Sequence, residues 1–227
     1  MKQRHFLLRT ALPNFVDNSK KLDMKKFIRN YALEIYTVIS LGLLLAGALM
    51  DNLSVIQKFV MVFNLLFILH EWEEGHYPGG FIDLISGMIG KDVPVETKRA
   101  SRIPTGILLI AFTFVPFFWD DCVIPILVTA TLGIFEGVVH MMAIRVFRLP
   151  KFYSPGMVTA ELELLVSVAL IVWLEQNNLA SASDYVLGVV IMIACFVAMQ
   201  RTLVWMVGMK YSDLPKRIRA QWSKPKN

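Results

Sequence analysis

The stretch "CVIPILVTATLGIFEGVVHMM", residues 122–142, decides the fold class of this chain. It is apolar almost throughout, and its only ionisable side chains are the cysteine at its start, Glu136 and His140. A helix needs about 20 apolar residues to cross the hydrocarbon layer of a membrane, and this stretch has that length. The sequence therefore predicts a transmembrane α-helix here, with an acid and an imidazole inside it.

The rest of the chain has the same character. Its 227 residues are 56% hydrophobic, and the mean hydropathy of +0.54 is well above that of soluble proteins. Six apolar runs are long enough to span, at about 32–50, 54–72, 103–119, 122–142, 157–175 and 185–209. We therefore expect an all-α, polytopic six-helix transmembrane bundle without a soluble catalytic lobe.

Basic residues alternate along the connecting segments. The basic segments are 1–30, 73–102, 143–156 and 211–227, and the turns without a basic residue are 51–52, 120–122 and 175–184. Lysine and arginine are retained on the cytoplasmic side, so both termini and the two longer loops are expected there. This predicts a multi-pass protein of the plasma (cytoplasmic or inner) membrane. It also explains the net charge of +5 without nucleic acid as a partner.

The expected organisation has three parts. Residues 1–30 form a cytoplasmic or interfacial segment, 31–210 form the bundle, and 211–227 form a basic cytoplasmic tail. The loop 75–102 contains "FIDLISGMI", an apolar stretch too short to span a membrane. We expect it to form an interfacial or re-entrant helix at the cytoplasmic mouth of the bundle.

Ionisable side chains gather toward the predicted cytoplasmic ends of the spans. Charged groups inside a membrane are costly, so they usually face a protein interior. Residues three or four positions apart share one helix face. His70 can therefore share a face with Glu73 and Glu74 in the second span, as can Glu136 with His140 in the fourth.

Two further spans contribute polar candidates. On the fifth span, Glu161 and Glu163 stand about 200° apart, so they cannot share a face. Glu163 aligns with Ser167 and is expected to face inward, whereas Glu161 is expected at the headgroup level or against another helix. Arg201 lies near the exit of the sixth span and is a candidate for binding an anionic head.

These side chains match the ligand set of a divalent metal. Zinc and iron bind imidazole and carboxylate groups, and glutamates and histidines on facing helices form two-metal sites in helix bundles. We expect one or two zinc or iron ions, held by His70, Glu73, Glu74, Glu136, His140 and Glu163. Two alternatives involve no metal. The acidic end of the second span could simply be exposed to water, and Glu136 and His140 could form a hydrogen bond only with each other.

Three motifs resemble one known family. "HEWEE", residues 70–74, is similar to the signature of the HXXEE-motif integral membrane proteins. "EGVVH" resembles that family's Asn-x-x-x-His motif, with Glu136 where the asparagine is expected, and "YSPGMVTAE" resembles a further stretch with Ser154 at an expected asparagine. The resemblance implies a small polytopic membrane protein with an enzymatic role, and it names no reaction.

The first functional hypothesis is a metal-dependent membrane hydrolase at the cytoplasmic leaflet, acting on a lipid or lipophilic substrate. His70, His140 and one carboxylate would hold the metal, and Glu73 or Glu74 would accept a proton from its bound water. Arg201 or the basic loops would hold the substrate's head.

Three alternatives stay open from the residues. They are a di-iron carboxylate oxidoreductase, a proton- or cation-coupled transporter, and a scaffold subunit in which the cluster only locks helices together. The outer halves of the spans offer no polar relay beyond Lys58, which suits an enzyme better than a conduit. Membrane lipids are the expected partners, and stripes of small residues would permit a homodimer.

Overall fold

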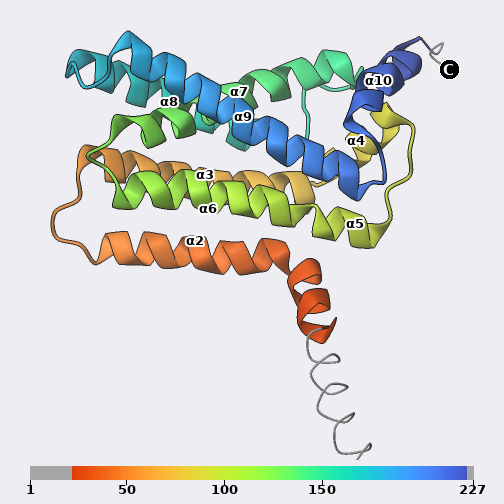
Figure 1. Cartoon of the computed structure of the whole chain (residues 1–227), viewed down its shortest axis with the longest axis horizontal. Coiled ribbons are helices and arrows are strands. Elements are labelled where there is room, and N and C mark those ends of the chain that lie inside the picture. The colour runs from red at the N-terminus through yellow and green to blue at the C-terminus, as the bar shows by residue number, and fades with distance from the viewer. Residues whose placement is uncertain (1–21, 224–227) are drawn as a thin grey trace, which may run out of the picture.

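A computed structural model describes residues 22–223 of the chain. Within that range the protein is helical and has no strand, as predicted (Figure 1). The helices are α2 (Ala32–Ala48), α3 (Val55–Gly75), α4 (Phe81–Ile89), α5 (Val95–Ala100), α6 (Arg102–Phe118), α7 (Val123–Val146), α8 (Met157–Gln176), α9 (Ala182–Met206), the 3-10 turn η1 (Tyr211–Asp213) and α10 (Leu214–Trp222). Most of the predicted N-terminal segment, 1–21, and the end of the tail, 224–227, lie outside the described residues.

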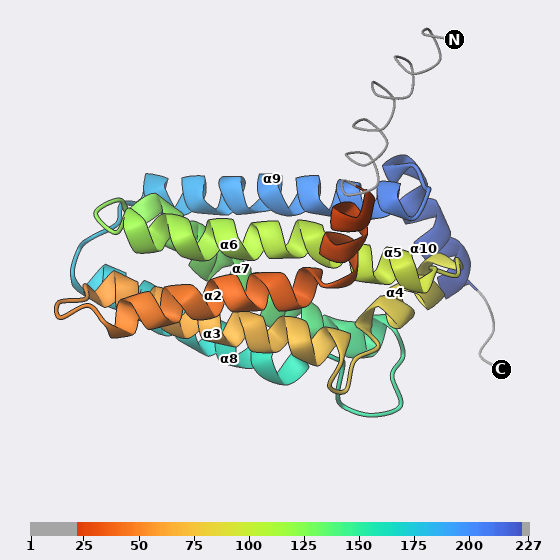
Figure 2. The ribbon, with the colours of Figure 1, turned by 90° about the horizontal axis from the view of Figure 1, so that it is seen from below.

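Five helical stretches are long and apolar enough to cross a membrane: α3, Val95–Phe118, α7, α8 and α9. A sixth results if α2 is joined to the preceding helical segment Leu22–Asn30, from which it is bent by 74°. The long helices run side by side along the longest axis (Figures 1 and 2). The all-helical bundle is therefore confirmed, and it is compatible with a multi-pass membrane protein.

Side-chain caps fix the helix starts at one end of the bundle. The Ser54 hydroxyl accepts from the amide of Gln57, and the Gln57 side chain accepts from the amide of Ser54, which completes a capping box for α3. The Gln57 amide group also donates to the carbonyl of Phe117 over 3.0 Å, so the start of α3 is tied to the end of α6. A second capping box, between Ser181 and Asp184, begins α9.

Small residues allow α7 and α8 to pack closely. A Cβ atom added to Gly133 would lie 2.3 Å from the Ser167 hydroxyl and 3.0 Å from the carbonyl of Glu163. The contact therefore requires glycine, because a side chain at this position would push the two helices apart. Around it, buried apolar side chains from α2, α3, α6, α7, α8 and α9 form the core.

The short helices α4, α5 and α10 gather at the end of the bundle opposite the capping boxes (Figures 1 and 2). α4 corresponds to the "FIDLISGMI" stretch that was expected to form a short helix. Arg217 of α10 donates to the carbonyl of Ile89 at the end of α4, over 3.3 Å. The Lys91 ammonium group donates to the carbonyl of Val207, just past α9. These bonds hold α4 and α10 against the end of α9.

Candidate metal centre

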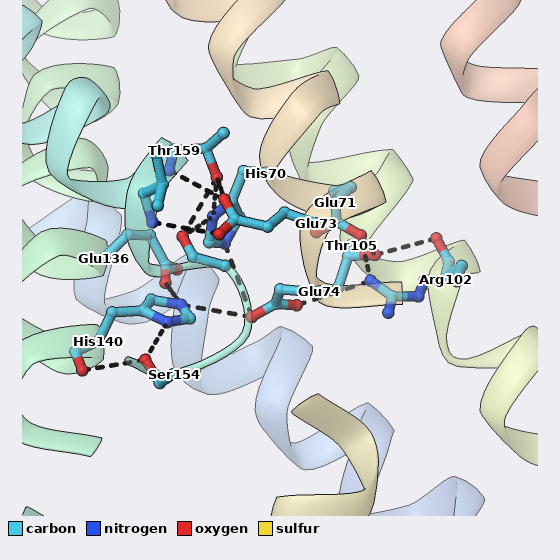
Figure 3. A network of polar contacts seen from close by, with 12 residues as sticks. His70, Glu71, Glu73, Glu74, Arg102, Thr105, Glu136, His140, Ser154 and Thr159 are labelled. Carbon is cyan, nitrogen blue, oxygen red and sulfur yellow. Dashed lines mark hydrogen bonds and ion pairs between the residues drawn. The ribbon is translucent and has the colours of Figure 1, made fainter. Parts of the chain in front are cut away.

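Four of the predicted site residues meet between α3 and α7 (Figure 3). Ligand atoms of His70, Glu136 and His140 all lie within 4.8 Å of one another. Glu74 Oε1 lies 3.3 Å from His140 Nε2 and 3.6 Å from His70 Nε2, and Glu136 Oε2 lies 3.8 Å from His140 Nε2. Ligands at zinc distances of 2.0–2.1 Å in a tetrahedron are about 3.3 Å apart. This buried group could therefore hold a metal ion.

Hydrogen bonding fixes the tautomer of His70. Its Nδ1 lies 3.0 Å from the carbonyl oxygen of Gly156 and 3.2 Å from the hydroxyl oxygen of Thr159. A carbonyl oxygen only accepts, so Nδ1 carries the proton and donates. Nε2 of the neutral ring is then unprotonated, and it is the atom that faces Glu74.

The ring of His140 is held in the same way. Its Nδ1 lies 3.2 Å from the Ser154 hydroxyl, which itself donates to the carbonyl of His140 over 3.1 Å. Because the serine proton is used in that bond, Nδ1 donates, and in the neutral ring Nε2 is the unprotonated nitrogen. Nε2 is buried and lies 3.3 Å from Glu74 Oε1, a contact that lacks the geometry of a hydrogen bond. Histidines that bind metals usually donate their other ring nitrogen to such a partner.

Gly156 closes the site from the loop before α8. Its φ of +92° lies in the left-handed region that favours glycine. A Cβ atom there would lie 2.7 Å from His140 Cε1, 2.8 Å from Glu74 Cγ and 2.9 Å from His70 Cε1. The backbone of Gly156 thus touches three of the four clustered side chains, and any other residue would push them apart.

Glu73 does not point into this cluster. Its carboxylate accepts four hydrogen bonds, from the Tyr153 hydroxyl (2.8 Å), the Val158 amide (3.2 Å), and the amide (3.0 Å) and hydroxyl (2.6 Å) of Thr159. The first amides of a helix lack partners within it, so Glu73 of α3 caps the start of α8. Burial and the neighbouring carboxylate raise the pKa of the Tyr153 phenol, which therefore stays a donor.

Glu71 is the third carboxylate of the motif and has its own partners. It accepts from Arg102 Nη1 over 2.7 Å, from the Tyr36 hydroxyl over 2.9 Å and from the Thr105 hydroxyl over 3.2 Å. Arg102 Nη1 also lies 3.6 Å from Glu74 Oε2, which links this network to the cluster (Figure 3).

Sequence reasoning missed the roles of Glu71 and Arg102. Arg102 was interpreted only as part of a basic loop, yet its side chain is buried. One signal was available, because Arg102 directly precedes an apolar run, where a charge requires a partner.

The remaining candidates are not among the residues whose ligand atoms converge. Glu163 faces inward as predicted and is 0% exposed, and both of its carboxylate oxygens lack a hydrogen-bond partner among residues 22–223. Glu161 is half-buried. Arg201 is exposed, and its guanidinium carbon lies 6.0 Å from the ring centroid of Tyr211. The arginine beside the cluster is Arg102.

Two cavities adjoin the cluster. One, of about 300 Å³, is mainly apolar and lies between α4, α6, α9 and α10, with His70, Glu74 and Glu136 in its wall. The other, of about 360 Å³, is bordered by charged and polar side chains of α2, α4 and α5. Glu74, Ile82 and Arg102 line both cavities, so the two are neighbours beside the cluster.

Comparisons with protein-family models, with curated proteins and with solved structures found no match. The functional inference therefore rests on the geometry of this site.

Proposed function

We propose that the protein is a metal-dependent integral membrane hydrolase that acts on a lipid or lipophilic substrate at the cytoplasmic leaflet. His70, His140 and Glu136 would hold one zinc ion, and Glu74 would act as the general base. The observation that carries this proposal is the orientation of the two imidazoles. Each uses Nδ1 to donate a hydrogen bond and directs Nε2 at the same buried point.

The donor set fits zinc. Two imidazoles and one carboxylate hold catalytic zinc in several hydrolases, where a fourth position stays open for water or substrate. His140 Nε2 supports the fit, because this buried nitrogen forms no hydrogen bond of good geometry even though the Glu74 carboxylate lies 3.3 Å away, and a metal between them would satisfy both groups. The resemblance to the HXXEE-motif proteins supports the same residues, since His70 and Glu74 belong to its signature.

Bound zinc lowers the pKa of a water ligand to about 7 and so supplies a nucleophile at neutral pH. Glu74 is placed to accept the proton. Its Oε1 faces the two imidazoles, whereas its Oε2 faces Arg102 at 3.6 Å. Arg102 is in turn held by Glu71, so the Glu74 carboxylate is fixed at one end and faces the centre with the other.

The apolar cavity supports a lipophilic substrate. Its volume of about 300 Å³ is within the range of small-molecule sites, and its wall reaches Glu74 and Glu136. Most of its apolar lining is contributed by α4 and the second half of α9. A substrate chain in this cavity would bring its polar end to the centre.

Metal analysis of purified protein tests the proposal. We expect about one zinc per chain in the wild type and little in His140→Ala, with helical content unchanged. His76→Ala is the matched control, because His76 is an exposed imidazole at the end of the same helix as His70. A folded wild-type protein without bound metal would overturn the proposal, and two irons per chain would favour a di-iron oxidoreductase instead.

A further inference from the structure

Glu74 and Arg102 line both an apolar cavity and a charged one. We propose that the substrate is an amphiphile with a zwitterionic head, joined to its chain by an ester. Its chain lies in the apolar cavity and its head in the charged cavity. This inference rests on the proposed function and deepens it by naming the class of substrate.

The apolar cavity is long enough for a hydrocarbon chain. Along α9 its wall runs from Phe196 to Val207, a rise of ~16 Å for a helix. An apolar cavity of that length can take an extended hydrocarbon chain. Leu214 and Ile218 of α10 belong to the same wall and lie beyond the end of α9.

The charged cavity is lined by equal numbers of basic and acidic side chains. Its basic side chains are Lys98, Arg99 and Arg102, and its acidic side chains are Glu34, Glu74 and Asp83. A head with one sign of charge would meet as many like charges as opposite ones, whereas a zwitterion can be complementary to both.

Some of these charges are already paired. Lys98 forms an ion pair with Asp83, and Arg102 is bound by Glu71. Arg99 and Glu34 are exposed and form no ion pair with a described residue, so they are the groups open to a head.

The residues shared by the two cavities fix the position of the ester. The junction of head and chain would lie at Glu74, the proposed base. Hydrolysis there joins the oxygen of water to the acyl carbon and breaks the bond from that carbon to the ester oxygen. The proton that Glu74 takes from water then passes to the leaving head, which departs as an alcohol, while the chain departs as a carboxylic acid.

Native mass spectrometry with non-hydrolysable amphiphiles tests the inference. Dodecylphosphocholine is the zwitterionic single-chain probe, dodecyl phosphate and dodecyltrimethylammonium carry one charge each, and didodecyl phosphate has two chains. We expect the wild type to retain dodecylphosphocholine most strongly. Equal or stronger retention of any of the three singly charged probes would overturn the zwitterionic head.

Substitutions that fill the apolar cavity test whether the hydrocarbon chain of the amphiphile binds there. Leu203→Trp on α9 and Ile85→Trp on α4 should each weaken dodecylphosphocholine binding about tenfold or more. Val190→Trp is the matched control, because Val190 lies on α9 and is 56% exposed. If both cavity variants keep their helical content and bind dodecylphosphocholine as the wild type does, the hydrocarbon chain does not lie in this cavity.

A His140→Ala background separates this inference from the metal centre. His140 does not line either cavity, so dodecylphosphocholine should bind that variant as it binds the wild type. Retention that persists without metal supports the amphiphile site even if the metal proposal fails. Loss of retention in His140→Ala with an intact fold would overturn the placement of the chain.

Discussion

Ser154 holds His140 at two points: its hydroxyl accepts from Nδ1 of the ring and donates to the backbone carbonyl of the same residue. The ring is therefore fixed in the orientation and tautomer that direct Nε2 at the cluster. Ser154 itself is fully buried in the loop between α7 and α8.

Ser154→Ala should weaken metal binding about 10- to 100-fold, because the His140 ring loses the partner that orients it. A competition titration with a chelator measures this affinity. Ser183→Ala, at an exposed serine near the start of α9, is the control and should leave metal affinity unchanged. Equal affinities in both variants would show that Ser154 does not orient the ligand.

Gly156→Ala should impair the centre directly. The new Cβ would lie under 3 Å from atoms of His70, Glu74 and His140, so metal affinity should fall by about tenfold or more. Gly80→Ala separates this contact from backbone strain, because Gly80 has a similar φ of +99° and no atom within 4 Å of its Cβ position. It should show only the strain, a loss of about 1–3 kcal/mol of unfolding free energy, with metal affinity retained. The same chelator titration, with unfolding in mixed SDS micelles, measures both quantities.

Glu73→Gln should act on stability rather than on the metal. A glutamine amide can accept only through its one oxygen, so some of the four donors at the start of α8 would lose their partner. Loss of a helix cap lowers the free energy of unfolding by about 0.5–2 kcal/mol. Unfolding in mixed SDS micelles and metal content measured together check the result. Loss of the metal with unchanged stability would place Glu73 in the coordination sphere instead.

Arg102→Met should be strongly destabilising. It leaves Glu71 and Glu74 buried without their cation, and breaking such a pair costs about 3–5 kcal/mol. Adding Glu71→Gln should recover part of that loss, because the uncompensated charge is removed. Unfolding free energies of the two single variants and the double variant measure the coupling. If the double variant is no more stable than Arg102→Met, the destabilisation does not come from the uncompensated charge of Glu71.

Spacing along the helix predicted which ligands share a face. His70 with Glu74, and Glu136 with His140, are four residues apart, and each pair does face the cluster. The predicted inward position of Glu163 follows from the same periodicity and is confirmed. Such pairs depend only on helix geometry, which the sequence determines locally.

Tertiary packing decided the rest of the site. Glu73 is one residue from Glu74, a rotation of about 100°, so its direction depends on which helix lies beside it. That neighbour is the start of α8, which the sequence did not position. Arg102 and Arg201 both lie near the end of an apolar run, and only the packing of α3 against α6 brings Arg102 to the cluster. Neither outcome could be obtained from spacing alone.

Glu74→Gln should remove hydrolysis while keeping the fold and the metal. The amide retains the shape of the side chain but cannot accept a proton, and loss of a general base lowers kcat by about 10²- to 10⁴-fold. Metal content should stay near that of the wild type, since His70, His140 and Glu136 are unchanged. Release of the alcohol head from a dodecanoyl ester of glycerophosphocholine measures the rate. Glu161→Gln is the control, because Glu161 lies on α8 and is half-buried outside the ligand group. Wild-type rates in Glu74→Gln would exclude Glu74 as the base, and loss of metal there would make it a fourth ligand.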